Sequence, residues 1–237
     1  MNFKSPLLRG RLVKRYKRFL ADVVLDDGRE ITATCPNTGS MLGLCDPGLA
    51  IWVSESNSPT RKYAHTWELV ELGKGKARSF VGINTGHPNA IVSEAVAAGQ
   101  IPPLAGYATL RREVKYGQSS RIDLLLEDPA KGLAYVEIKN VHLLREPGLA
   151  EFPDSKTERG VKHLAELTDM VRAGHRAVMI YLIQRADCAR FRPAADIDPK
   201  YAAALATARA SGVEAYALTC SLSPEAIAVD RVLPAIE

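Results

Sequence analysis

The sequence predicts a mixed α/β protein in two parts: a small β-barrel over residues 1–82 and an α/β domain with a central mixed sheet over residues 83–237. Three observations predict this division. Up to about residue 80, short alternating segments are separated by turns, which is an all-β pattern. From residue 84 onward, helical periods and strand patterns alternate. Between the two parts, Gly73-Lys74-Gly75-Lys76 indicates a turn or linker.

The first part contains five short segments with the alternation typical of strands. They are Leu12–Tyr16, Phe19–Leu25, Glu30–Thr34, Ala50–Glu55 and Trp67–Leu72. The second and third are joined by Asp26-Asp27-Gly28, a sequence typical of a tight turn. Five short strands in this length favour a barrel of the oligonucleotide-binding (OB) kind.

The second part opens with a helix over Asn89–Ala98, which Pro88 begins and Gly99 ends. Strands are expected at Leu110–Tyr116, Ile122–Glu127, Leu133–Lys139, Ala177–Gln184 and Val213–Thr219. Two further helices are expected: one opened by the capping box of Ser155 and Glu158 and ended by Gly174, and one from Asp198-Pro199 to about Ala210. An antiparallel start followed by alternating strands and helices predicts a mixed sheet flanked by helices.

Composition describes an ordinary globular protein: 46% of the 237 residues are hydrophobic and 24% are charged. No apolar run approaches the roughly 20 residues that span a bilayer, and the basic N-terminus lacks the apolar stretch of a signal peptide. The four cysteines have no metal-binding spacing and are too few for a disulfide scaffold. We therefore expect a cytoplasmic protein without a membrane partner.

The positive charge is concentrated near the N-terminus. Seven basic residues precede the first acid, Asp22, and without them the chain is slightly acidic; they are Lys4, Arg9, Arg11, Lys14, Arg15, Lys17 and Arg18. Such a run can neutralise phosphates, with Tyr16 and Phe19 as stacking surfaces. It is equally typical of an edge strand that uses its charges to block aggregation.

A hairpin over Ile122–Lys139 contains the residues with the clearest chemistry. A loop from Asp128 to Gly132 pairs Glu127 with Leu133, and the same register then pairs three sets of apolar residues: Ile122 with Ile138, Leu124 with Val136, and Leu126 with Ala134. On the opposite face it sets Asp123 across from Glu137. Two like charges in this position destabilise a strand pair unless a positive charge compensates them.

A divalent cation supplies that charge. Asp123 and Glu137 would be metal ligands and catalytic residues, and Lys139, on the same face as Glu137, would orient water or stabilise developing negative charge. Oxygen ligands favour one or two magnesium or manganese ions. Glu94, a lone carboxylate on an otherwise apolar helix, is a candidate further ligand.

Each of these residues also has a purely structural interpretation. The hairpin acids can form a solvated surface ladder with Lys139, although Leu125 and Tyr135 on the same face indicate that it is partly covered. Glu94 can instead lie at the rim or pair with a nearby arginine. Arg159, His163 and Glu166 form a polar stripe on the helix after Ser155, which faces either nucleic acid or water. Gln184 ends an apolar strand and is placed near the same cleft by position alone.

Several long motifs resemble the sugar fermentation stimulation protein A (SfsA) family nearly from end to end. They are Arg15–Val23, Cys35–Gly39, Arg61–Leu69, Val114–Gly117, Ser120–Asp123, Phe152–Asp154 and Thr157–Leu164. The resemblance implies an OB-like barrel joined to a domain similar to the PD-(D/E)XK nucleases, with Asp123, Glu137 and Lys139 at the nuclease motif and Glu94 at its upstream acid. Ile122 stands where that motif has proline. The resemblance also implies non-specific DNA binding and a role in regulating sugar (maltose) catabolism genes.

Three functions remain open at this stage. The first is a magnesium-dependent phosphodiesterase acting on nucleic acid, and the second is a non-catalytic DNA-binding regulator with a nuclease fold. The third is a sugar or metabolite sensor, although no part of the sequence resembles a dedicated sugar site. The residues expected to contact nucleic acid, most simply DNA, are Arg11, Lys14, Arg15, Lys17, Arg18, Arg61, Lys62, Lys115, Arg159 and His163. A homodimer is compatible with the sequence.

Overall fold

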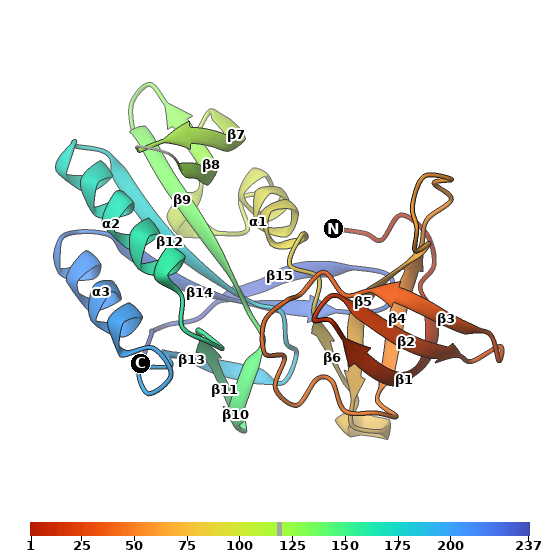
Figure 1. Ribbon diagram of the computed structural model, residues 1–237. Helices are drawn as coiled ribbons and strands as arrows, with labels where there is room; N and C mark the ends of the chain where they lie inside the picture. The colour runs from red at the N-terminus through yellow and green to blue at the C-terminus, as the bar shows by residue number, and fades with distance from the viewer. Residues whose placement is uncertain (118–119) are drawn as a thin grey trace.

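The computed structural model describes residues 1–117 and 120–237, and Figure 1 shows a barrel and a helix-flanked sheet side by side. The barrel strands are β1 (Leu8–Tyr16), β2 (Leu20–Leu25), β3 (Glu30–Thr34), β4 (Ala50–Glu55) and β5 (His65–Leu72). They pair in the order β3-β2-β1-β4-β5, and a parallel pairing of β3 with β5 closes the ring. The predicted five-stranded OB barrel is therefore confirmed. A short 3-10 turn (Gly75–Ala77) leads to β6 (Ser79–Gly82), which extends the sheet beyond β5.

Alternation along the strands determines which side chains fill the barrel. Leu12, Val23, Ala33, Ile51 and Trp67 are all buried and form part of one apolar cluster. Because every second residue of a strand points to the same face, the intervening polar residues remain on the outside. Burial of this apolar set is what stabilises the small barrel.

The second domain is built on a six-stranded mixed sheet. Its strands are β7 (Thr109–Tyr116), β8 (Ser120–Asp128), β9 (Gly132–Val141), β12 (Arg176–Ile183), β14 (Glu214–Leu222) and β15 (Ile227–Val232). They lie in the order β15-β14-β12-β9-β8-β7. The pairings of β9 with β12 and of β12 with β14 are parallel, whereas those at both edges are antiparallel. The sheet is thus mixed, as the alternation of elements predicted.

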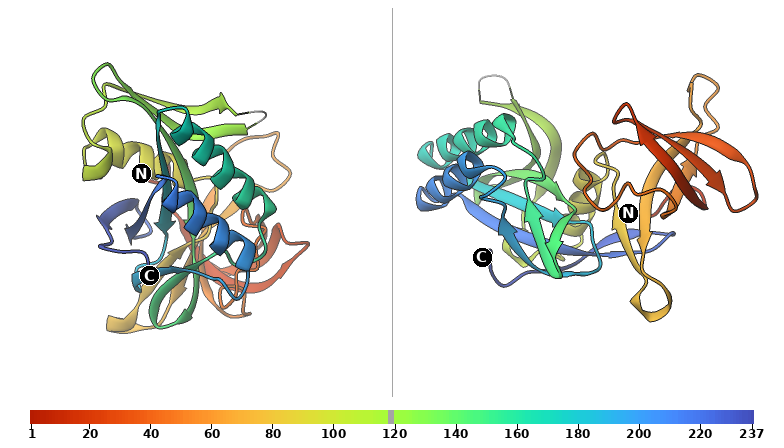
Figure 2. Two further views of the ribbon diagram at one scale, coloured as in Figure 1. Left: turned by 90° about the vertical axis from the view of Figure 1, so that its left-hand side faces the viewer. Right: turned by 60° about the horizontal axis from the view of Figure 1, so that its bottom comes forward.

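Helices cover both faces of this sheet. The helix α1 (Pro88–Ala97), followed by a 3-10 turn (Pro102–Leu104), packs on one face in a cluster with Val136 and Ile180. The helices α2 (Glu158–Arg172) and α3 (Pro199–Ala210) lie side by side on the other face, as Figure 2 shows. No helix in the described ranges is long and apolar enough to cross a bilayer.

Local sequence signals predicted most helix ends correctly, with one exception. Asp198 caps α3 by accepting a hydrogen bond from the Tyr201 N–H at 3.0 Å, as predicted. The predicted capping box of Ser155 is wrong, because Thr157 is the residue that caps α2, through a 3.0 Å bond from the Gly160 N–H. The sequence also gave no indication of β15 or of a second small sheet, which pairs β10 (Leu143–Glu146), β11 (Gly148–Phe152) and β13 (Cys188–Pro193).

The two domains make contacts on both sides of the predicted boundary at residue 82. Asn2 forms a bridge with Ala226, so the first residues of the chain lie with the second domain. The Gly82 N–H donates to the Gln184 carbonyl at 2.8 Å. Leu7 and Leu69 from the barrel half belong to the same apolar cluster as α1. The domains therefore share part of one core.

Candidate nuclease-like cleft

A polar cleft of about 430 Å³ opens between the N-terminal ends of α1 and α2 and the strands β7, β8 and β9. We call it the carboxylate cleft. Its lining includes Asn89, Glu113, Asp123, Glu137, Lys139 and His163. The three residues predicted from the hairpin to act together, Asp123, Glu137 and Lys139, all reach this one cleft.

The hairpin register that places the acids is confirmed over its outer part. The pairs run from Asp128 with Gly132 to Leu124 with Val136, in the predicted order. The predicted continuation to Asp123 with Glu137 and Ile122 with Ile138 is absent from the pairing of the described strands. Instead, the Asp123 carboxylate accepts a hydrogen bond from the Ile138 N–H at 2.7 Å. A side chain thus replaces a strand partner, and the strands separate where the acids lie.

Glu137 is buried beside a lysine and a histidine. The residue is 2% exposed, and Oε1 lies 2.7 Å from the Lys139 ammonium and in contact with His163 Nδ1. Burial works against the charged carboxylate, but the hydrogen bond from His163 and the charge of Lys139 lower the pKa of Glu137 overall. Its second oxygen, Oε2, is buried and has no hydrogen-bond partner among the described residues. A buried anionic oxygen without a partner is costly, so this atom favours a ligand.

Asp123 is electrostatically different from Glu137. Burial and the nearby Glu137 charge raise the pKa of Asp123 to about 6, although the Ile138 N–H and Asn89 partly offset them. Two neighbouring acids whose pKa values are pushed in opposite directions are typical of functional sites. A divalent cation between them would remove the repulsion that raises the pKa of Asp123.

Helix α2 adds two nitrogen-bearing side chains to the cleft. The Arg159 Nε–H donates to His163 Nε2 at 3.2 Å, which leaves Nδ1 as the protonated nitrogen that faces Glu137. Lys139 Nζ lies 3.0 Å from the same Nδ1. Arg159 and His163, expected to contact nucleic acid, thus line the cleft. Glu166, third in the predicted stripe, instead lies deeper and accepts from the Ser120 hydroxyl at 2.8 Å.

Glu94 does not reach the carboxylate cleft. Its side chain is 60% exposed and lies 2.7 Å from the N-terminal ammonium of Met1. The prediction that Glu94 joins the hairpin acids as a metal ligand therefore fails on geometry. Asn89, at the start of the same helix, faces the cleft instead, and its amide donates to Asp123 Oδ1 at 2.8 Å. Gln184 lies behind the cleft, where its amide donates to Asn140 Oδ1 at 2.7 Å.

Two arginines of the barrel hold the loop of residues 35–41. Arg15 Nη2 donates to the carbonyls of Asn37 and Gly39 at 2.9 and 3.0 Å, and Arg18 donates to the Thr38 carbonyl. Their contact with nucleic acid stays a prediction. Arg18 is exposed, as are the other cations expected to contact nucleic acid outside the cleft: Arg11, Lys14, Lys17, Arg61, Lys62 and, on β7, Lys115.

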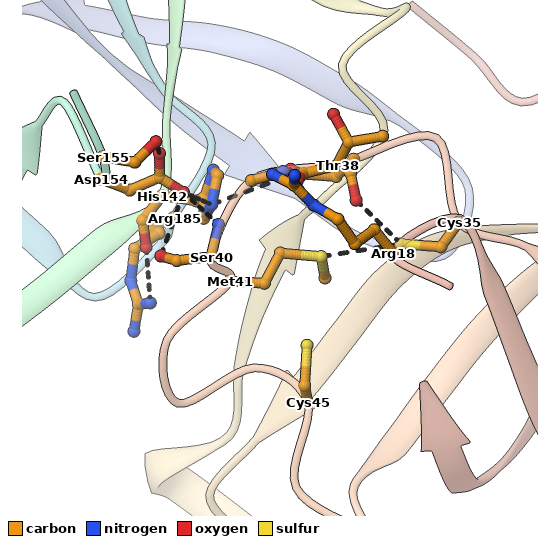
Figure 3. Close-up of polar contacts among 12 residues, drawn as sticks. Arg18, Cys35, Thr38, Ser40, Met41, Cys45, His142, Asp154, Ser155 and Arg185 are labelled. Atoms are coloured by element: carbon orange, nitrogen blue, oxygen red, sulfur yellow. Dashed lines mark hydrogen bonds and ion pairs between the residues drawn. The ribbon is translucent and has the colours of Figure 1, made fainter. Parts of the chain in front are cut away.

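The loop of residues 35–41 joins the barrel to the second domain, as the close-up in Figure 3 shows. The backbone N–H and hydroxyl of Ser40 donate to Asp154 Oδ2 at 2.9 and 3.2 Å. His142 Nε2 lies 3.6 Å from the same oxygen. Burial works against the Asp154 charge, but His142 and Ser40 lower the pKa of Asp154 to about 2. This contact lies just before α2, so the barrel loop and the cleft helix share an anchor.

Two family models match the chain. The SfsA N-terminal OB domain matches residues 13–83, and the sugar fermentation stimulation protein RE domain matches residues 86–226. A sugar fermentation stimulation protein homolog of Rhodospirillum centenum is 62% identical over 98% of both chains. The homolog of Rhizobium meliloti is 59% identical over the full length of both.

The fold also matches a solved structure. The structure of Pyrococcus furiosus SfsA in complex with Ca²⁺ has a TM-score of 0.87 and 29% sequence identity, and the match covers 100% of this chain and 98% of that one. The similarity includes both domains, because the whole length is covered.

Proposed function

The chain belongs to the sugar fermentation stimulation protein family, and from this premise we propose that it binds nucleic acid and hydrolyses phosphodiester bonds in the carboxylate cleft with a divalent metal ion. The observation that supports the proposal best is the convergence of Asp123, Glu137 and Lys139 in one polar cleft. An OB barrel, the usual scaffold for oligonucleotide binding, is joined to it.

The residues present fit a hard cation such as magnesium or manganese. Both acids offer oxygen ligands, and Glu137 Oε2 is buried with no hydrogen-bond partner in the described part of the chain. The related Pyrococcus furiosus protein was solved in complex with Ca²⁺, another cation that takes oxygen ligands. When bound, the metal would polarise a phosphate oxygen and lower the pKa of a coordinated water.

The protein's own residues would position the substrate and balance charge. Asp123 and Glu137 would hold the metal. Lys139, held by its hydrogen bond to Glu137, would orient the attacking water or stabilise negative charge that develops on the phosphate. Arg159 would hold a substrate phosphate at the mouth of the cleft, and the exposed barrel lysines would hold the strand farther away. DNA is the substrate that we propose within this class.

One observation favours a second candidate, a DNA-binding regulator without turnover. Glu137 Oε1 is already paired with the Lys139 ammonium and accepts a hydrogen bond from His163, so the protein can keep this carboxylate charged without a metal. A regulator of this kind would bind DNA with strong salt dependence but with no metal requirement.

Metal titration followed by cleavage assays separates the two candidates. We would titrate manganese and magnesium into the wild-type protein by calorimetry and then incubate it with single-stranded and double-stranded DNA. The variants are Asp123→Ala with Glu137→Ala, and Lys139→Met; the matched control is the exposed Glu94→Gln. The nuclease proposal expects metal binding that the double variant loses, and metal-dependent cleavage that Lys139→Met also loses. Absence of metal binding, even with DNA present, would reject it and leave the regulator.

A further inference from the structure

Glu113 lies directly across from Asp123 at the one interruption in the pairing of β7 with β8. The strands pair in continuous register from Thr109 with Glu127 to Tyr116 with Ser120, except at the position that would pair Glu113 with Asp123. Two carboxylates opposite each other destabilise an antiparallel pair. The ladder is therefore broken where a third acid enters the carboxylate cleft.

The backbone of Glu113 is strained. Its φ is 53°, in the left-handed region that residues other than glycine rarely adopt. The neighbouring Arg112 and Val114 keep their regular pairing, so the strain is confined to one residue. Strain of this kind at a non-glycine residue is typical of functional sites.

Asn89 joins the two opposed acids. Its amide nitrogen donates to Glu113 Oε1 and to Asp123 Oδ1, each at 2.8 Å. The amide therefore offers both carboxylates a shared partial positive charge, at a place where a cation could interact with both. Asn89 is the first residue after Pro88, which begins α1, so this link is fixed to the start of a helix.

An independent observation in the same cleft indicates a ligand. Glu137 is only 2% exposed, and its Oε2 atom has no hydrogen-bond partner among the described residues. Asp123 is linked to β9 on one side, where it accepts from the N–H of Ile138, the neighbour of Glu137, and to Glu113 on the other by Asn89. The three acids thus line the same cleft, one each from β7, β8 and β9.

We propose that Glu113 is the third carboxylate of the divalent cation site, in the role that sequence reasoning assigned to Glu94. The inference rests on the proposed metal-dependent function. Asn89 holds Glu113 beside Asp123, so the two side chains are preorganised for a cation.

Calorimetric titration of manganese into Glu113→Gln tests this assignment. We expect the dissociation constant to rise on the order of tenfold or more, since a charged ligand becomes a neutral one. Glu94→Gln is the matched control, because it makes the same change on the neighbouring helix outside the cleft, and it should bind as the wild type does. Circular dichroism would establish that both variants are folded. If Glu113→Gln does not fold, Glu113→Asp, which keeps the charge but shortens the side chain, should bind with an intermediate constant.

The outcomes distinguish this inference from the function on which it rests. The wild type could bind manganese while Glu113→Gln, or Glu113→Asp if only that variant folds, binds it with the same dissociation constant. This result would overturn the role of Glu113 and leave the nuclease proposal intact. No binding by the wild type, with or without DNA, would reject the metal-dependent function and this inference with it.

Discussion

Replacing Asp123 by asparagine is expected to stabilise the metal-free protein at neutral pH. Burial and the Glu137 charge raise the pKa of Asp123 to about 6, from an ordinary value of 3.8. Below pH 3.8 this carboxyl is protonated in both the folded and the unfolded chain and has no effect on stability. As pH rises toward about 6, the unfolded chain loses the proton first, so folding stability falls. Above that pH the full penalty of about 3 kcal/mol remains.

Asparagine removes this penalty but also one hydrogen bond. The Asp123 carboxylate accepts from the Ile138 N–H and from the Asn89 amide, and an asparagine side chain has only one acceptor oxygen. The lost bond costs about 1 kcal/mol. A net gain of about 2 kcal/mol should raise the melting temperature by roughly 4–8 °C for a chain of this length.

Urea unfolding of the wild type and Asp123→Asn in the presence of a chelator, at several pH values from about 4 to 8, would measure the effect. The difference in the free energy of unfolding should favour the variant at neutral pH and reverse sign near the acid end. A variant that is less stable by the same amount at every pH would refute the reasoning, because the penalty would then have no electrostatic origin.

Four further variants have outcomes that follow from the same structure. Asp154→Asn should change stability with the opposite sign, because His142 and Ser40 lower the pKa of Asp154 to about 2. The variant should lose about 2 kcal/mol of folding stability above pH 4, and this loss should shrink as pH falls toward 2. A loss that is independent of pH would contradict this. Arg15→Ala should cost about 2 kcal/mol in unfolding experiments with little effect on DNA affinity, since its guanidinium holds the loop of residues 35–41. Lys17→Ala should leave stability unchanged but weaken DNA binding and reduce the slope of its salt dependence by about 0.9. If Arg15→Ala weakened DNA binding and Lys17→Ala did not, Arg15 would be the residue that faces DNA. Glu113→Gly should be more stable than Glu113→Ala by about 1 kcal/mol, because its φ of 53° favours glycine, and an equal melting temperature would argue against strain there.

The hairpin and its chemistry could be predicted because they depend on local pattern. The register from Asp128 with Gly132 to Leu124 with Val136 follows from loop length and apolar pairing alone. The same alternation placed Glu137 and Lys139 on one face, where they meet at 2.7 Å. The interruption at Asp123 could not be predicted, since it depends on a side chain competing with the backbone for the Ile138 N–H.

The errors concern residues whose partners are distant in sequence. Glu94 was assigned to the cleft from its apolar helix, but α1 turns it toward the chain terminus at Met1. The run of positive charge around Arg15 did not show its partners, which are carbonyls of the loop of residues 35–41. Glu113 was missed because its role depends on a backbone angle and on a helix from another part of the chain. Charge patterns show that a residue is polar, but not which distant group satisfies it.

The barrel holds the two helix starts that border the carboxylate cleft, in addition to any surface that it offers for binding. Glu68 on β5 is buried and lies 2.7 Å from His87, the residue that precedes α1. Ser40 in the barrel loop holds Asp154, shortly before α2 begins. Each helix then presents a cleft residue in its first turn, Asn89 from α1 and Arg159 from α2. Because the barrel anchors both helix starts, the barrel and the acids of the cleft are held in place by the same contacts. The two domains therefore form one structural unit around the cleft, as the proposed function requires.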